Sequence, residues 1–194
     1  MAQVRVEVLP SEEILRRLAH FDLDAALTYL EPDPPEGALA VELYRERYLL
    51  LTPDDGPLAR HEQVSYAEAA ALPLCVLTPE MENRRILDSA GAKTGFRLEP
   101  DFEADSVAAI YAHIATRRWS GIVAHTWVHV FGVPEGMRAV PLAEPSPHPA
   151  VGLVALDNRP VPLLVRALFD TIEPFNIAGT RGDEPADPVP KIRA

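Results

Sequence analysis

The sequence reads Leu74-Cys75-Val76-Leu77-Thr78-Pro79-Glu80-Met81-Glu82-Asn83-Arg84-Arg85 at the point that decides its fold. The four apolar residues at the start of this stretch are typical of a strand that is buried on both faces. Thr78 is a favourable N-cap, and Pro79 suits the first position of a helix. The stretch therefore predicts a strand followed directly by a helix from Glu80 to Ser89.

A strand that runs into a capped helix directs free backbone N–H groups at the carboxyl edge of its sheet. In open α/β sheets this edge is where small polar ligands bind. A second predicted strand, at residues 121–124, ends in His125-Thr126-Trp127 and indicates another such place. At each of these two strand ends, the alternative interpretation is an ordinary strand-to-helix turn that binds no ligand.

Composition and charge exclude several classes of protein. The chain has 194 residues, of which 47% are apolar, and its formal net charge is −11. The apolar content predicts a globular protein, and the negative charge argues against direct nucleic-acid binding, which needs clustered Lys and Arg. The single cysteine, Cys75, is interpreted as a small buried residue and not as a nucleophile. Because neither a signal peptide nor an apolar run of membrane length is found, we expect a cytoplasmic protein without membrane contact.

Periodicity and turn residues predict the remaining elements. Strands are predicted at residues 4–8, 23–30, 39–43, 48–51, 137–142 and 151–156, and an extended segment is predicted at 97–102. Helices are predicted at residues 11–18, 66–72, 107–114 and 162–172. Since a strand, a helix and a strand follow one another within residues 4–30, this part is predicted to be a βαβ unit with parallel strands.

Short phrases of the sequence follow one another in a recognisable order. They are Phe21-Asp22-Leu23-Asp24-Ala25-Ala26-Leu27, Leu43-Tyr44-Arg45-Glu46-Arg47-Tyr48-Leu49-Leu50-Leu51-Thr52-Pro53, Gly56-Pro57-Leu58-Ala59, Phe102-Glu103-Ala104-Asp105-Ser106, Gly121-Ile122-Val123, and Arg138-Ala139-Val140-Pro141-Leu142 with Val151-Gly152-Leu153-Val154. In this order they resemble the effector-binding (regulatory) domain of LysR-type transcriptional regulators. The resemblance covers roughly residues 3–175.

The resemblance implies an α/β fold of two Rossmann-like subdomains joined by two crossover segments, like that of type II periplasmic binding proteins. Residues 1–51 and 151–176 would form subdomain I, which would be incomplete, and residues 52–150 would form subdomain II. Residues 177–194, which are rich in Gly, Pro and charge, are expected to be a disordered tail.

Two departures from the family are expected to matter. Neither the winged helix-turn-helix nor the first strand and helix of the regulatory domain is recognised in the sequence. In the family that first strand lies between the strands predicted here at residues 4–8 and 23–30. We hypothesise that these two strands close up on each other or recruit a partner, because an exposed sheet edge invites pairing.

The resemblance also implies a cleft lined by strand ends and helix starts, and matching positions give ten candidate effector-binding residues. They are Ser11, Thr28, Tyr29, Thr78, Pro79, Glu80, Met81, His125, Thr126 and Trp127. Helix capping is the alternative role of Ser11 and Thr78. A neutral His125 could orient a carboxylate and Trp127 could stack on a ring, with a structural, hydrogen-bonded histidine as the alternative.

Other polar residues are interpreted as lacking a special role. His125 and His129 have the spacing of a metal pair, but no acid completes the set, so neither a metal nor a cofactor is predicted. Asn83, Arg84 and Arg85 are expected to face solvent. No catalytic motif is recognised, so no enzymatic activity is predicted.

The sequence is thus interpreted as a small-molecule effector-sensing domain of a LysR-type regulator. A small anionic metabolite would bind in the cleft and shift the relative pose of the two subdomains. The chain is expected to form a homo-oligomer or to pair with a full-length regulator. The alternatives are a stand-alone ligand-binding or dimerisation module, a periplasmic solute-binding protein, an enzyme with His125 as its base, and a non-functional relic that pairs with an intact regulator.

Overall fold

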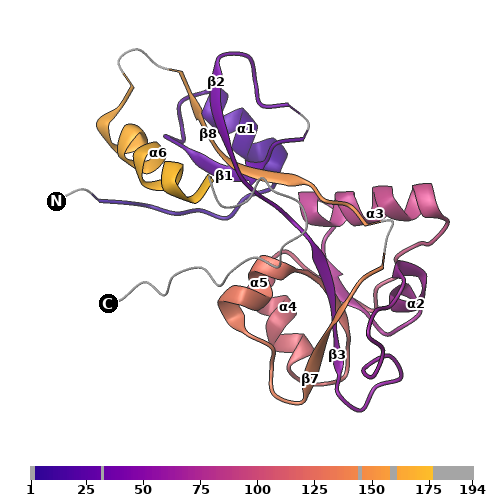
Figure 1. The fold of residues 1–194 in the computed structure, drawn as a ribbon. Helices are drawn as coiled ribbons and strands as arrows, with labels where there is room; N and C mark the ends of the chain where they lie inside the picture. The colour runs from indigo at the N-terminus through magenta and orange to yellow at the C-terminus, as the bar shows by residue number, and fades with distance from the viewer. Residues whose placement is uncertain (1–2, 32, 144–145, 158–160, 177–194) are drawn as a thin grey trace. The chain divides into compact units, whose positions relative to one another are not determined.

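The computed structural model describes residues 3–31, 33–143, 146–157 and 161–176. Its helices are α1 (Ser11–Ala19), α2 (Tyr66–Ala70), α3 (Glu82–Thr94), α4 (Val107–Ile114), α5 (His125–Phe131) and α6 (Leu163–Asn176). Its strands are β1 (Ala26–Tyr29), β2 (Ala38–Arg45), β3 (Tyr48–Pro53), β4 (Cys75–Leu77), β5 (Phe102–Ala104), β6 (Gly121–Ala124), β7 (Met137–Pro141) and β8 (Ala150–Leu156). The elements divide into unit 1, which comprises Met1–Ile14 and Glu46–Pro149, and unit 2, which comprises Leu15–Arg45 and Ala150–Ala194 (Figure 1).

Unit 1 is built on a mixed set of strands. β3 pairs antiparallel with β6 on one side and with β7 on the other. β4 pairs parallel with β5, and a parallel bridge between Leu74 and Ser120 places β4 beside β6. The fully buried strands predicted at β4 and β6 are confirmed, because every residue of both strands is buried.

The core of unit 1 lies on both faces of these strands, because successive side chains of a strand point to opposite faces. Leu50 of β3 packs on one face with residues of α2 and α3, such as Tyr66 and Leu87. Leu51, the next residue, packs on the other face with Ile110 of α4 and its neighbours. Helices therefore cover both faces of the unit 1 strands (Figure 1), as the uninterrupted apolar strand sequences predict.

Tyr111 of α4 offers a test of this packing. Its side chain is 8% exposed, and its hydroxyl has no hydrogen-bond partner among the described residues. Burial raises the pKa of Tyr111 to about 12. Because a buried unsatisfied hydroxyl costs free energy, we expect Tyr111→Phe to keep or raise the free energy of unfolding, by up to about 1 kcal/mol.

Urea unfolding measures this effect, and Tyr48→Phe is the matched control. The Tyr48 hydroxyl is also buried but accepts a hydrogen bond from Asn83 Nδ2 at 3.5 Å. Its removal should lower the free energy of unfolding by about 1 kcal/mol. A loss of stability in Tyr111→Phe as large as in Tyr48→Phe would contradict the description of Tyr111.

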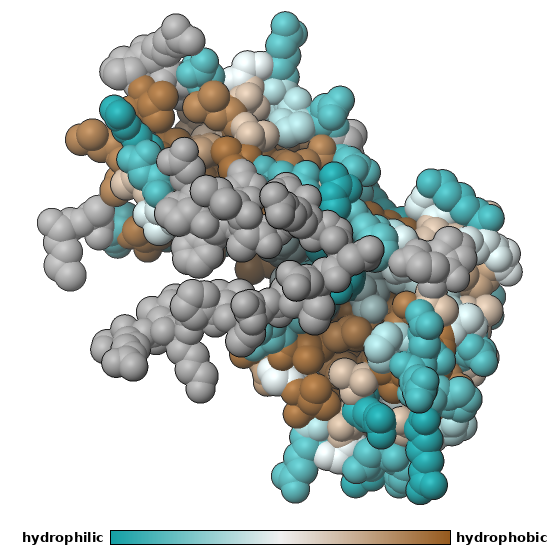
Figure 2. Space-filling view, viewed as in Figure 1, coloured by the Kyte–Doolittle hydropathy of each residue, from teal (hydrophilic) through white to brown (hydrophobic). Residues whose placement is uncertain are grey.

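Unit 2 contains a three-stranded sheet in the order β1-β8-β2, and both pairings are antiparallel. Its central strand, β8, is buried from Ala150 to Ala155. Helix α6 packs against β2. It exposes Leu163, Leu164 and Leu168, and Figure 2 shows apolar surface where α6 lies.

Two predictions about the N-terminal part were wrong. β1 does not form a parallel βαβ unit, because it pairs antiparallel with β8. Residues 4–8 form no strand, and Val4, Val6 and Val8 are 77%, 84% and 79% exposed. Alternation of apolar and polar residues yields a strand only where a neighbouring strand supplies hydrogen bonds. The hypothesis that residues 4–8 close up as a strand on β1 is therefore incorrect for the described chain.

The division between the units falls between Arg45 and Glu46 and between Pro149 and Ala150. The predicted subdomain I, residues 1–51 and 151–176, also included residues 1–14 and 46–51, which belong to unit 1. β3 belongs to unit 1 because it pairs with β6 and β7 along Tyr48–Pro53. The division into subdomains stays a prediction. Residues 177–194, which were predicted to be a disordered tail, lie outside the described residues.

Candidate functional site

The carboxyl edge of the unit 1 strands brings several candidate residues to one side. Cys75 N–H donates to Ser120 O, and Ser120 N–H donates to Pro73 O, each at 2.8 Å, so β4 and β6 run parallel next to each other. Their carboxyl ends therefore lie at the same edge, where Thr78 follows β4 and His125 follows β6. Because β3 is antiparallel to β6, it begins at this edge, directly after Arg47.

His125 is held in a defined orientation by the backbone of Arg47. Arg47 N–H donates to His125 Nδ1 at 3.0 Å, and His125 N–H donates to Arg47 O at 2.8 Å. Desolvation lowers the pKa of His125, and the positive charge of Arg47 lowers it further. Nδ1 also lies 3.3 Å from Arg47 O. The shorter contact with Arg47 N–H favours the neutral tautomer that carries its proton on Nε2. In this tautomer Nε2–H is a hydrogen-bond donor.

A buried polar cluster lies beside this histidine. Glu46 is 2% exposed and Asn83 is 5% exposed, and Asn83 Nδ2 donates to Glu46 Oε1 at 3.2 Å. Glu46 N–H donates to Pro149 O at 2.9 Å, which links the two segments where the chain passes between its units. The prediction that Asn83 faces solvent was wrong, because α3 turns its first residues toward Glu46 and Tyr48.

Residues Thr78 to Met81 form a turn before α3 instead of the first helical turn. Thr78 N–H donates to Ala104 O, and Met81 N–H donates to Thr78 O, both at 3.0 Å. The helix begins at Glu82, and Met81 is its N-cap without a side-chain hydrogen bond. Thr78 was therefore wrongly predicted as the N-cap and Pro79 as the first helical residue. Glu80 is exposed within this turn, while Thr78 and Met81 are half-buried.

The other candidate residues lie in three places. Thr126 and Trp127 belong to α5 and are half-buried, and Trp127 packs against the core cluster of Leu51 and Ile110. Ser11 is the first residue of α1. Thr28 and Tyr29 belong to β1 of unit 2, where Thr28 is buried and Tyr29 is half-buried.

The sequence did not lead us to predict Glu46 and Arg47 as residues of this edge. A pattern that could have identified them is Arg45-Glu46-Arg47, three charged residues directly before a buried strand. Charged residues at a strand start are usually read as solvated. Only the structure shows that the middle one of the three is buried.

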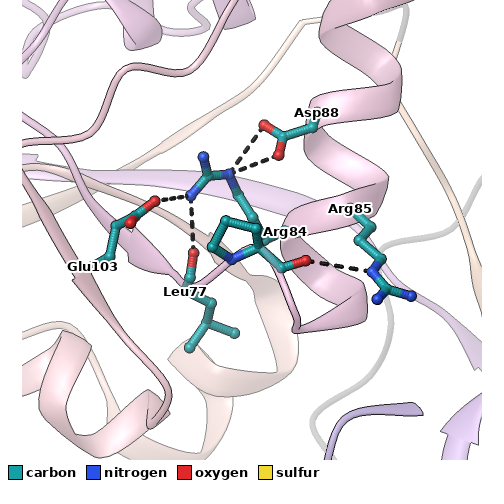
Figure 3. A network of polar contacts seen from close by, with 6 residues as sticks. Leu77, Arg84, Arg85, Asp88 and Glu103 are labelled. Carbon is teal, nitrogen blue, oxygen red and sulfur yellow. Dashed lines mark hydrogen bonds and ion pairs between the residues drawn. The ribbon is translucent and has the colours of Figure 1, made fainter. Parts of the chain in front are cut away.

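Arg84 also departs from its predicted exposure. Its side chain is 7% exposed, and Arg84 Nη1 donates to Leu77 O at 3.0 Å and to Glu103 Oε1 at 2.6 Å. Arg84 Nε contacts both carboxylate oxygens of Asp88 at 3.0 Å (Figure 3). Burial acts to lower the pKa of Arg84, but the hydrogen bonds to Glu103 and Asp88 outweigh it and raise the pKa above its usual value. Arg84 thus ties α3 to β4 and β5.

Arg85 is half-exposed, with a side chain that is 47% exposed, as expected of a residue on the solvent side of α3. Cys75 is buried in β4, and burial raises the pKa of its thiol to about 11. A thiol of that pKa is protonated at neutral pH, so the interpretation of Cys75 as a packing residue agrees with the structure. Within the described part of the chain, no three His, Cys, Asp or Glu side chains gather as metal ligands would.

Comparison with known proteins gives a family match and several structural matches. The profile of the family described as "LysR substrate binding domain" matches residues 2–175. The fold is similar to the effector-binding domain of QuiR in complex with shikimate, with 15% identity over 87% of this chain and 79% of that chain and a TM-score of 0.71. It is also similar to the CcmR regulatory domain of Synechocystis PCC6803 in complex with 2-PG, with 14% identity over 90% and 83% of the two chains and a TM-score of 0.75.

A third similar structure is the reduced form of the OxyR regulatory domain from Pseudomonas aeruginosa. Its identity to this chain is 21%, the match covers 82% of this chain and 77% of that chain, and the TM-score is 0.68. At these identities the structures establish the fold, and the family profile establishes the kind of domain. None of the helices in the described ranges combines the length and the apolar character that crossing a bilayer requires.

Proposed function

Because the chain belongs to the LysR substrate-binding domain family, and is therefore a non-enzymatic effector-binding regulatory domain of a LysR-type regulator, we propose that it senses a small anionic metabolite. The proposed site lies at the carboxyl edge of the unit 1 strands. One observation carries this proposal: the parallel neighbours β4 and β6 both end at this edge, next to His125, whose ring is oriented by the backbone of Arg47.

Two features of this edge favour an anion, beside the carboxylates of Glu46 and Glu80 that the same edge carries. Arg47 is exposed and directly precedes β3, so its guanidinium can approach a carboxylate or another oxyanion. Helix α3 has 13 residues and begins at the same edge, and the N-terminus of a helix favours negative charge. The solved structures of QuiR with shikimate and of CcmR with 2-PG show that domains of this fold hold small metabolites.

Under this proposal units 1 and 2 are the two subdomains of a type II periplasmic-binding-protein-like domain. The chain crosses between them at Arg45/Glu46 and at Pro149/Ala150. The hydrogen bond from Glu46 N–H to Pro149 O joins these two crossings within unit 1. Glu46 also accepts a hydrogen bond from Asn83, near the start of α3. A movement of the two subdomains about the crossing segments would therefore be transmitted to the start of α3.

We also propose that the domain pairs with a second copy or with a full-length regulator. The apolar residues Val130, Phe131 and Val133 are 72%, 54% and 42% exposed in unit 1, and a contiguous exposed apolar group is typical of an interaction surface. Light scattering over a range of protein concentrations tests this proposal. A mass that stays monomeric at the highest concentration would rule out pairing between copies.

A thermal-shift screen tests the proposed effector site. The probes are small carboxylates and oxyanions, with shikimate among them. A probe that binds only the folded state must raise the melting temperature, by an amount that grows with its concentration. We expect at least one probe to do so for the unmodified chain, and we expect the shift to be lost in His125→Ala.

The matched control is His129→Ala, one helical turn along α5. His129 is exposed and makes no contact with Arg47 in the described structure. The shift should survive this change, measured against the melting temperature of the same variant without ligand. A shift that is equally large in His125→Ala, or the absence of a shift with every probe, would contradict the proposal.

A further inference from the structure

A pocket of about 380 Å³ lies along α3 and the loop that follows it, apart from the carboxyl edge. It is lined by Arg84, Asp88, Ala92, Phe96, Arg97 and Leu98. None of the candidate effector-binding residues lines it. Its wall combines two guanidinium groups and one carboxylate with the apolar surfaces of Ala92, Phe96 and Leu98.

The guanidinium of Arg84 keeps one nitrogen available in this pocket. Nε is used by Asp88, and Nη1 is used by Leu77 O and Glu103. Nη2 makes no contact within the described chain, and Figure 3 shows it pointing away from Leu77 and Glu103. Although the side chain is only 7% exposed, Nη2 is not fully buried, so it keeps contact with solvent from the pocket side. An oxygen acceptor placed in the pocket would satisfy it.

Arg97 supplies a second positive charge that is free to adjust. Its side chain is 86% exposed, and its contact with Glu99 is long, at 3.7 Å. An exposed pair of this kind contributes little, so Arg97 can turn to a ligand at small cost. The carboxylate of Asp88 is engaged through both of its oxygens by Arg84 Nε, which offsets its charge.

We propose that this pocket binds a small carboxylate with an apolar body. One carboxylate oxygen accepts a hydrogen bond from Arg84 Nη2, and the charge of the ligand faces Arg97. The apolar body lies against Ala92, Phe96 and Leu98, of which Leu98 is 5% exposed and so part of a firm wall. The site is separate from the proposed effector site and does not depend on it.

Titration of the ¹⁵N-labelled chain with sodium benzoate, followed by amide NMR spectra, tests this proposal. We expect saturable shifts in the amides of residues 84–98. Ala92→Leu fills the pocket from an exposed helical position that tolerates leucine, and it should abolish these shifts. Arg97→Gln should weaken the binding of benzoate about threefold, because it removes an exposed positive charge that faces the carboxylate.

The control is Arg60→Gln, which removes another exposed arginine, one outside the pocket, and should leave the affinity unchanged. The proposal is overturned if benzoate causes no saturable shift in residues 84–98. It is also overturned if Ala92→Leu binds as tightly as the unmodified chain, or if Arg60→Gln weakens binding as much as Arg97→Gln. Shifts confined to residues 47, 78–83 and 125–127 would place benzoate at the effector site and would equally overturn it.

Discussion

Replacement of Arg84 by methionine is expected to lower the free energy of unfolding by about 3 kcal/mol. The change removes the donor of three hydrogen bonds and leaves Leu77 O, Asp88 and Glu103 without this partner. Asp88 and Glu103 are 41% and 40% exposed, so water solvates part of the charge left behind. The loss should therefore fall at the lower end of the range for a broken buried ion pair.

Arg85→Met is the matched control at the next position of α3. Arg85 donates to Pro79 O at 3.3 Å and lies 3.6 Å and 3.7 Å from Glu12 and Glu82. Because the Arg85 side chain is 47% exposed and both ion pairs are long, the loss should be about 0.5 kcal/mol or less. Urea unfolding with a common m-value measures both variants. If Arg84→Met and Arg85→Met lowered the free energy of unfolding equally, the hydrogen bonds of Arg84 would not be a particular source of stability for unit 1.

Gly152→Ala is expected to destabilise the chain by about 3 kcal/mol, because β8 has no room for a methyl group at this position. A Cβ atom there would collide with the backbone oxygen of Val41 in β2 and would lie 2.9 and 3.0 Å from the terminal carbons of Leu30. The strand is central and paired on both sides, so its backbone cannot move away from the contact.

Gly37→Ala is the control, because it replaces a glycine at a position where the added methyl group causes no collision. Gly37 has a φ of +81°, and a Cβ atom added there would meet nothing within 4 Å. Its replacement costs only the strain of a left-handed backbone, about 1 kcal/mol. Thermal or urea unfolding compares the two variants. If Gly152→Ala were no more damaging than Gly37→Ala, the antiparallel packing of β8 between β1 and β2 would be incorrect.

The sequence predicted the buried strands well, since local pattern alone determines them. Leu74–Leu77 and Gly121–Ala124 are uninterrupted apolar runs next to turn residues, and both form fully buried strands with core side chains on each face. The family resemblance rested on the order of short phrases, and the family match over residues 2–175 confirms it.

The pairing of β1 could not be predicted in the same way. β1 pairs with β8, so that Thr28 lies opposite Gly152, more than a hundred residues later in the chain. Proximity in sequence favoured a parallel partner at residues 4–8, and nothing local identifies so distant an antiparallel strand. Residues 4–8 show the converse case, in which a strand-like pattern has no described partner and stays exposed.

The polar residues were mispredicted for a related reason. Asn83 and Arg84 look like ordinary surface residues near the start of a helix. Their burial depends on acceptors from other parts of the chain, namely Glu46 for Asn83 and Glu103 for Arg84. Burial of a polar group is tolerated only with such partners. A single sequence does not reveal those partners until the strands are assembled.

Amide NMR mapping with the carboxylate or oxyanion that gives the largest thermal shift tests the central claim most directly. Ligand binding at the carboxyl edge predicts saturable shifts in residues 47, 78–83 and 125–127. The same residues should stay unshifted in His125→Ala at equal ligand concentration. Saturable shifts confined to residues outside these three segments would contradict the claim that this edge of unit 1 holds the effector.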